Sequence, residues 1–363
     1  MRFKKRGFVA AMAFLIAATG IFACGQKQEE VEIAQEEAEE KIEIGMSFDT
    51  FVVERWQRDR DIFVATANEL GAEVNVQNPN GNVEEQIRQL EYFIDKKVDV
   101  IVVVPIDADS LSEVIGKAKD EGIKVISYDR LANKADVDLY ISFDNEAVGR
   151  CMGKSMGKQM TVGDKVIMIS GPLTDGNVSQ VNAGFMEEME KAGIQVVDIA
   201  YMDEWRPELA YEYMEENIDS IKEDVQGIMC GNDNLASQVI FALSENRLAG
   251  EILVVGQDAD LDACQRIVEG TQFMTVYKPV NLLAEEAAHM AVALAKGEEI
   301  VCEEMINDGT YDVPYIKLTP EAVTKENIDD VIIGQGFHLK EDVYINIRNV
   351  MPSTEEETDN IKE

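Results

Sequence analysis

Short runs of β-branched and other apolar residues alternate with amphipathic stretches along most of this 363-residue chain. The apolar runs are expected to be strands at 42–46, 73–76, 99–105, 124–129, 165–171, 227–230 and 252–256. Helical periodicity separates them, as in 83–97 and 111–121. A β-α-β-α order with continuously apolar strands is typical of parallel sheets covered by helices on both faces. We therefore predict an α/β fold built on doubly wound parallel sheets.

The N-terminal residues have the composition of an export signal. Arg2, Lys4, Lys5 and Arg6 precede residues 7–23, which carry no charge, and Cys24 follows. A basic segment followed by an apolar one predicts a signal peptide over 1–23. Residues 21–24 resemble a bacterial lipobox, which makes Cys24 the expected lipidation site and places the protein outside the cytoplasm, anchored to the membrane. Ordinary secretion with cleavage nearby is one alternative, and a spanning helix of about 20 residues is another.

Polar tracts flank the region that can fold. Segment 24–41 begins with Cys24 and continues with mostly Gln, Glu, Lys and Ala, so it is expected to form an acidic, disordered tether; residues 349–363 are expected to form an acidic tail. Removing 1–23 takes away four basic and no acidic groups, so the net charge changes from −37 to −41. Such a surface repels nucleic acid and anionic lipid. The negative charge can also serve only to keep the protein soluble, because like-charged molecules repel one another. The remaining length is more than one hydrophobic core usually organises, which predicts two domains.

Polar residues follow four of the expected strands: Asp129-Arg130, Asp144-Asn145, Asn232-Asp233 and Gln257-Asp258. Each Asp or Asn could simply cap the helix that begins there. Ligands of doubly wound sheets, however, bind beyond the carboxyl ends of the strands. Repetition of the pattern at four strand ends favours one shared polar cavity.

The sequence contains few residue patterns that are typical of enzyme active sites. His289 and His338 are the two histidines of the chain, so histidine triads and metal centres have almost nothing to use. Residues 149–155 resemble a phosphate loop but have three intervening residues where four are needed, and they lie in a helical pattern. We expect no catalytic residue, no metal and no cofactor. The pairing of Cys151, Cys230, Cys264 and Cys302 cannot be read from the sequence.

Trp56 and Trp205 each stand between charged neighbours. Either indole could belong to a core or could cover a ligand. A sugar presents C–H groups on its faces and hydroxyls at its rim, so aromatic faces combined with Asp, Asn and Arg suit it.

Five ordered motifs, at 54–61, 128–130, 140–145, 256–261 and 275–279, together resemble the sugar-binding proteins of bacterial ABC importers, in the type I periplasmic-binding-protein family. The resemblance extends over about 43–337. It implies two lobes joined by three hinge strands, with each lobe discontinuous in sequence. The first lobe would comprise 42–146 plus 279–311, and the second 147–278 plus 312–348.

The resemblance also implies a ligand, a monosaccharide and D-xylose in particular, with ABC permease subunits as partners and a monomeric state. Ribose, galactose or glucose are alternative ligands, and a sugar-sensing receptor component is an alternative role. An exported glycosidase remains a further alternative, whereas a transcription regulator would need a basic helix-turn-helix where this chain has its signal. The implied ligand-binding residues are Arg55, Trp56, Asp129, Arg130, Asn177, Trp205, Asn232, Asp258 and Lys278. Asp175 replaces Asn177 if the alignment shifts.

Overall fold

The computed structural model describes residues 41–347, apart from 52 and 54. The expected signal peptide, the lipidation site Cys24, all of the tether except Lys41 and the acidic tail lie outside the described residues. No helix among the described residues is long and apolar enough to cross a membrane.

Strands and helices alternate through most of the described chain. The strands are β1 Glu43–Ser47, β2 Glu73–Gln77, β3 Val100–Val103, β4 Lys124–Tyr128, β5 Leu139–Phe143, β6 Lys165–Ser170, β7 Gln195–Tyr201, β8 Gly227–Cys230, β9 Leu253–Gln257, β10 Met274–Tyr277, β11 Glu304–Asn307, β12 Asp312–Leu318 and β13 Glu321–Thr324. The α-helices are α1 Arg55–Glu69, α2 Val83–Lys96, α3 Ser112–Asp120, α4 Asn145–Gly157, α5 Gly176–Ala192, α6 Pro207–Asp224, α7 Asp233–Glu245, α8 Leu261–Glu269, α9 Val280–Ala295 and α10 Lys340–Val343. Short 3-10 and π turns cover Asp203–Trp205 and Asp329–Ile333. All seven expected strands are present, with ends that differ by at most two residues.

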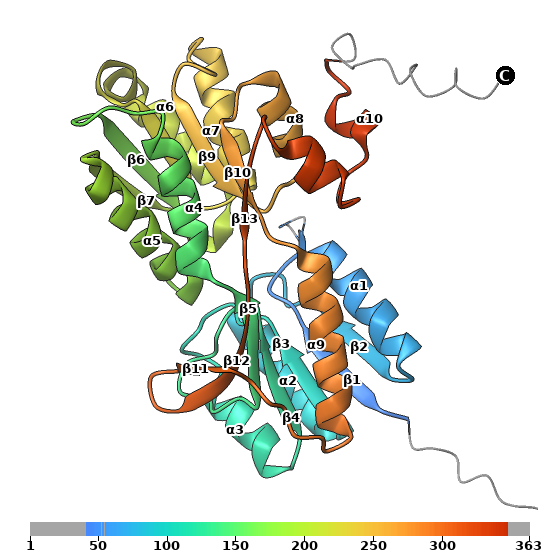
Figure 1. Cartoon of the computed structure of the whole chain (residues 1–363). Coiled ribbons are helices and arrows are strands. Elements are labelled where there is room, and N and C mark those ends of the chain that lie inside the picture. Colours follow the sequence, from blue (N-terminus) through green and yellow to red (C-terminus); the bar gives the residue numbers. More distant parts are fainter. Residues whose placement is uncertain (1–40, 52, 54, 348–363) are drawn as a thin grey trace, which may run out of the picture. The chain divides into compact units, whose positions relative to one another are not determined.

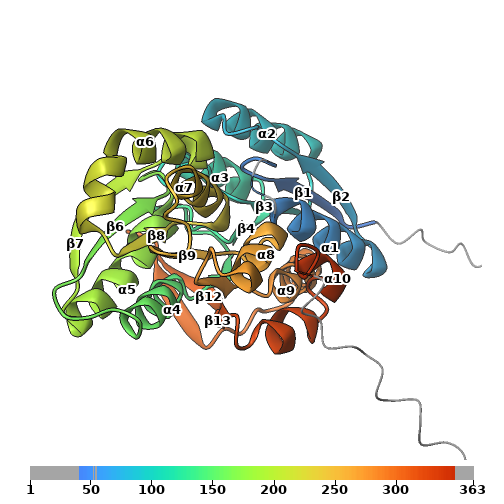
Figure 2. The same cartoon turned by 90° about the horizontal axis from the view of Figure 1, so that it is seen from above.

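The first sheet has the order β11-β12-β5-β4-β3-β1-β2 among the described residues. Its pairs are parallel except for β11 with β12. Both faces are buried: α1 and α9 contribute Phe63 and Leu283 to one core, and α2 and α3 contribute Phe93 and Ile115 to the other. Figure 2 shows these helices on opposite sides of the sheet. The β2-β1-β3-β4-β5 part is a doubly wound order whose direction reverses between β1 and β3.

The second sheet repeats this arrangement with the order β13-β10-β9-β8-β6-β7 among the described residues. Only β13 in it runs antiparallel to its neighbour. Helices α6 and α7 cover one face, and α4 and α5 cover the other. The strand order reverses between β6 and β8, so each sheet has its own switch point, the place where such sheets bind ligands.

Within residues 41–347, three segments connect the two sheets (Figure 1). They follow β5 into α4, β10 into α9, and β12 into β13. The sequence-based expectation of two doubly wound sheets joined by three crossings is therefore confirmed.

The third crossing lies at a different position from the one expected. Residues 312–318 were assigned to the second lobe, but β12 pairs in parallel with β5 and in antiparallel with β11, both in the first sheet. The physical reason is that β12 completes main-chain hydrogen bonds on the outer side of β5. The chain passes to the second sheet only after Leu318, where β13 begins to pair with β10.

The segment that resembled a phosphate loop lies inside α4 and serves helix packing. A Cβ on Gly149 would lie 2.0 Å from the carbonyl oxygen of Val181 in α5, and one on Gly184 would lie 2.1 Å from that of Glu146. The two helices therefore cross in backbone contact. These glycines are needed because no side chain fits between the helices.

We predict that Gly149→Ala lowers the free energy of unfolding by about 3 kcal/mol, the upper range for overpacking a close contact. Gly116→Ala is the matched control, because Gly116 lies within α3 and nothing comes within 4 Å of its added Cβ. That control should gain up to about 1 kcal/mol from helix propensity. Urea unfolding measures both variants, and a Gly149→Ala protein as stable as the wild type would contradict the packing argument.

Candidate functional site

A polar cavity lies where the carboxyl ends of strands from both sheets meet. Asp129 and Arg130 follow β4, and Asn145 follows β5. From the second sheet, Asn232 follows β8 and Lys278 follows β10. The complete lining consists of Val53, Arg55, Trp56, Asp129, Arg130, Asn145, Ser170, Gly171, Asp175, Asn177, Val178, Val181, Asn182, Trp205, Gly231, Asn232, Gln257, Asp258 and Lys278.

All nine residues that the sequence singled out for ligand binding line this one cavity. Their contact with a ligand stays a prediction. Asn177 and its alternative Asp175 both line the cavity, so their positions do not decide between them. Asn145, Ser170, Asn182 and Gln257 were not chosen. For Asn145 and Gln257 the signal was available, since both belong to recognised motifs and to the polar pairs at strand ends.

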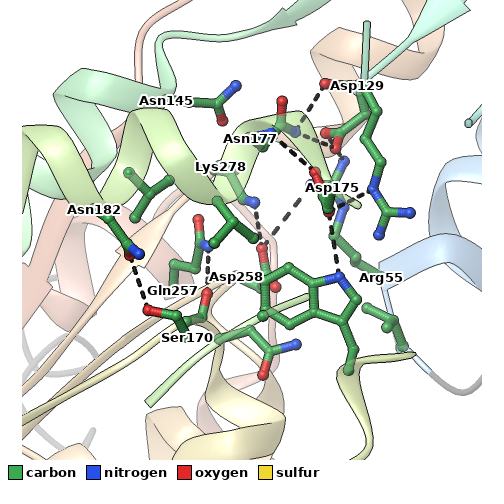
Figure 3. A pocket seen from close by; sticks show the side chains of 18 of the residues that line it. Arg55, Asp129, Asn145, Ser170, Asp175, Asn177, Asn182, Gln257, Asp258 and Lys278 are labelled. Carbon is green, nitrogen blue, oxygen red and sulfur yellow. Dashed lines mark hydrogen bonds and ion pairs between the residues drawn. The ribbon is translucent and has the colours of Figure 1, made fainter. Parts of the chain in front are cut away.

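Arg55 occupies the centre of the first ionic cluster (Figure 3). Its Nη2 lies 2.8 Å from Asp129 Oδ2 and 3.1 Å from Asp59 Oδ1, and its Nη1 lies 3.9 Å from Asp258 Oδ1. Lys278 Nζ lies 2.6 Å from the same Asp258 oxygen. These side chains are at most 8% exposed, so each charge depends on its partners rather than on water.

Arg130 organises a second cluster across the cavity. Its Nη1 lies 2.7 Å from Asp49 Oδ2, and its Nε lies 2.7 Å from Asp175 Oδ2. Asp175 also accepts a hydrogen bond from Trp205 Nε1 at 3.2 Å. Residues after β1, β4 and β6 are thereby joined into one chain of charge-assisted contacts.

The carboxylates differ in how firmly they hold their charge. Burial would raise the pKa of Asp129, but Arg55, Lys278 and Arg130 outweigh it, and the pKa lies below its ordinary value. Burial raises the pKa of Asp175 and that of Asp59 despite their arginine neighbours. Asp129 is therefore held as an acceptor of hydrogen bonds.

Asp129 sits in a left-handed backbone conformation, with φ of 62°. Its carbonyl oxygen accepts hydrogen bonds from Ser142 Oγ at 2.6 Å, Asn177 Nδ2 at 3.0 Å and the Tyr140 hydroxyl at 3.1 Å. Such a conformation persists in a non-glycine residue only when its surroundings fix it, and it is common at functional sites. The contacts turn the Asp129 carboxylate toward Arg55.

The two tryptophans belong both to the cores and to the cavity wall. Trp56 is 2% exposed and Trp205 is 9% exposed, and each packs in the core of a different sheet. The Arg55 guanidinium carbon lies 4.3 Å from the centre of the Trp56 ring. The core reading and the ligand-wall reading of these residues are thus compatible.

Helix capping explains some of the strand-end residues but not all of them. Asp144, Asp175 and Asn232 cap α4, α5 and α7 by accepting main-chain N–H hydrogen bonds. Asp129 and Asp258 cap no helix and instead face basic groups. Asn232 combines the two roles, since it caps α7 and lines the cavity.

Several polar atoms of the lining lack a hydrogen-bond partner within the described part of the chain. They are Arg55 Nε, Trp56 Nε1, Asn145 Nδ2 and Gln257 Oε1. Buried donors and acceptors of this kind are costly unless something completes them. They mark the wall as one suited to a neutral ligand that carries both donors and acceptors.

Other chemistries find less support. No group of three His, Cys, Asp or Glu side chains among the described residues is arranged to hold a metal ion. His289 is exposed on α9, and His338 Nε2 donates to the Ala259 carbonyl at 2.8 Å. The four described cysteines are unpaired thiols.

Comparison with known proteins gives consistent results. The family model of a periplasmic binding protein domain matches residues 44–299. A D-xylose-binding periplasmic protein of Haemophilus influenzae is 44% identical over 307 residues, covering 84% of this chain and 92% of its own. The protein of the same description from Escherichia coli K12 is 43% identical over 84% and 93%. The crystal structure of an ABC transporter solute binding protein from Clostridium phytofermentans with bound β-D-glucose superposes with a TM-score of 0.76 at 25% identity, covering 83% of this chain and 99% of that one.

A cavity-wall prediction concerns Gly171, where an added Cβ would lie 2.3 Å from the Trp205 ring. In a Trp56→Phe background, Gly171→Ala should displace the Trp205 indole and shift its fluorescence to longer wavelength, because the ring loses a buried position. Gly176→Ala is the control, since the nearest atom to its Cβ is 4.0 Å away. Identical emission spectra for the two variants would contradict the predicted contact.

Proposed function

The chain belongs to the periplasmic binding protein family, and on that premise we propose that it is the sugar-binding component of an ABC importer that captures D-xylose in the cavity between its two sheets. The observation that carries the proposal is the convergence of nine predicted ligand-binding residues on one cavity. The relatives named D-xylose-binding proteins support the choice of sugar.

The lining groups match the chemistry of a pyranose rim. Each hydroxyl can donate one hydrogen bond and accept others, so it needs partners of both kinds. Asp129 and Asp258 supply acceptors, and Arg55, Arg130 and Lys278 supply donors. Hydrogen bonds to charged groups contribute about 1.5–3 kcal/mol each, which lets a small neutral ligand bind tightly.

The two indoles match the faces of the ring. Trp56 comes from α1 beside the first sheet, and Trp205 from the turn after β7 in the second sheet. Aromatic faces bury the C–H groups of a sugar while its rim stays free for the polar residues. A sugar held in this way contacts groups from both sheets and would favour a closed arrangement of the two lobes.

Binding without chemistry is the reading we favour over an exported glycosidase. The relatives are solute-binding proteins. A glycosidase needs one carboxylic acid with a raised pKa to protonate the leaving group. Asp129 has a lowered pKa beside Arg55, which makes it a poor proton donor. Asp175 has a raised pKa, but both of its oxygens already accept hydrogen bonds, Oδ1 from the Asn177 N–H and Oδ2 from Arg130 and Trp205. Incubation with aryl xylosides should therefore release no aglycone.

We also propose an extracytoplasmic location, a monomeric state and delivery of the sugar to permease subunits. The support for anchoring is the sequence of residues 1–24, which resembles a lipoprotein signal. A single lipidated binding protein near the membrane would keep captured sugar close to its permease.

The first functional prediction is sugar selectivity, measured by calorimetric titration of the mature protein. D-xylose should bind at least about tenfold tighter than D-glucose, because fitting the extra hydroxymethyl group into a closed cavity costs about 1–3 kcal/mol. D-ribose has the same size but inverts one hydroxyl, so it should leave a buried partner unpaired and bind more weakly. Equal or tighter binding of glucose or ribose would overturn the assignment to xylose but not to sugars.

The second functional prediction is that Cys24→Ala releases the protein from membranes into the soluble fraction. The physical reason is that the mature chain, with a net charge of −41 after loss of four basic groups, is repelled by anionic lipid. Fractionation of cells expressing the wild type and the variant measures the effect. Continued membrane association of Cys24→Ala would rule out the proposed anchor.

A further inference from the structure

The loop that presents Asp258 to the cavity has an unfavourable backbone. Asp258 has φ of 99° and Ala259 has φ of 56°, so two consecutive non-glycine residues adopt left-handed or neighbouring conformations. Such conformations are unfavourable for residues that carry a side chain and persist only where the surroundings hold them. Asp258 nevertheless lies with its carboxylate 2.6 Å from Lys278 Nζ.

A second carboxylate, Asp233, lies behind this loop and outside the cavity lining. It is the first residue of α7 and is fully buried. Its Oδ2 accepts hydrogen bonds from the main-chain N–H of Asp260 at 3.2 Å and from Thr275 Oγ1 at 2.6 Å. Thr275 Oγ1 in turn accepts the N–H of Ala259 at 3.1 Å. One carboxylate oxygen therefore fixes two successive N–H groups of the loop, one directly and one through a hydroxyl.

The other oxygen of Asp233 is fixed by the second sheet. Its Oδ1 accepts from Gln272 Nε2 at 2.7 Å, and it occupies the space above Gly256, where a Cβ would lie 2.3 Å away. The position of the carboxylate is thus set by β9 and by the segment that leads into β10. The loop is held against the sheet from which Asp258 must project.

The hydrogen-bond partners of this carboxylate are neutral groups, and the Arg266 guanidinium lies nearby, with its Nη2 donating to the Asp233 main-chain carbonyl at 3.3 Å. Arg266 favours the ionised carboxylate, but burial outweighs it and raises the pKa of Asp233 to about 7. An apolar residue would fill the same space without the cost of burying a carboxyl group. The hydrogen bonds to the loop are what an apolar replacement could not supply.

We propose that Asp233 is a positioning residue for sugar binding, which acts through Thr275 to hold the backbone of Asp258 and Ala259 in the conformation that presents the Asp258 carboxylate. This inference rests on the proposed function of the cavity. Asp233 would not touch the sugar, but it would fix the position of the Asp258 carboxylate, which accepts hydrogen bonds from the sugar hydroxyls.

The test measures D-xylose affinity by calorimetry for Asp233→Ala and for the milder Thr275→Val, which keeps the shape of the side chain and removes the hydroxyl. We expect a loss of at least tenfold for Asp233→Ala and of about threefold to fivefold for Thr275→Val. Ser244→Ala is the matched control, because Ser244 lies in the same helix, α7, and its hydroxyl donates within that helix to the main-chain carbonyl of Ile240 at 2.7 Å. It should bind within twofold of the wild type.

A glycine rescue separates positioning from general stability. Glycine adopts left-handed conformations without strain, so adding Ala259→Gly to Thr275→Val should recover at least half of the logarithmic loss of affinity. A variant that was weakened only by poorer folding would instead lose further stability with the added glycine. Thermal unfolding of each sugar-free variant, measured in parallel, identifies that case.

The outcomes are distinguishable. Wild-type protein that binds no monosaccharide contradicts the proposed function itself. Wild-type binding together with unchanged affinity in Asp233→Ala and Thr275→Val overturns the role of Asp233, as does the absence of any glycine rescue. If Asp233→Ala does not fold, Thr275→Val with and without Ala259→Gly decides the question alone.

Discussion

The buried pairing of basic and acidic side chains at the strand ends is the interaction on which the rest of this site depends. Arg55, Arg130 and Lys278 meet Asp49, Asp59, Asp129, Asp175 and Asp258 with almost no exposure to water. Taking one charge out of water costs several kcal/mol, and removal of a partner leaves that cost uncompensated. The two sheets must therefore deliver their strand ends to nearly fixed positions for any of these groups to be stable.

That constraint also explains how the cavity can favour an uncharged ligand. The cations already have carboxylate partners, so they attract no free anion strongly. Arg55 Nε, Asn145 Nδ2 and Gln257 Oε1 lack partners among the described residues. A molecule rich in hydroxyls can complete such groups without disturbing the ion pairs. Asp233 and Thr275 contribute to the same cavity, because their hydrogen bonds to the loop fix the position of the Asp258 carboxylate as an acceptor.

The sequence predicted most of this arrangement because the governing rules are local. Apolar β-branched runs mark the parallel strands, and the polar pairs that follow them must lie at one edge of a doubly wound sheet. Asp129 and Asp258 could be found in this way. The pairing of Arg130 with Asp175 could not, since it joins residues from different sheets and no periodicity records it. The place of β12 was missed for a similar reason, because its partner β5 is remote in sequence.

We propose that one sugar ring occupies the cavity with its faces against the indoles and its rim against the ion pairs. A crystal structure of the protein grown with D-xylose tests it most directly. We expect density for a pyranose between Trp56 and Trp205, with its hydroxyls within hydrogen-bond distance of the Arg55 guanidinium and of the Asp129 and Asp258 carboxylates. A sugar bound elsewhere, or a cavity that holds only water at saturating xylose, would contradict it.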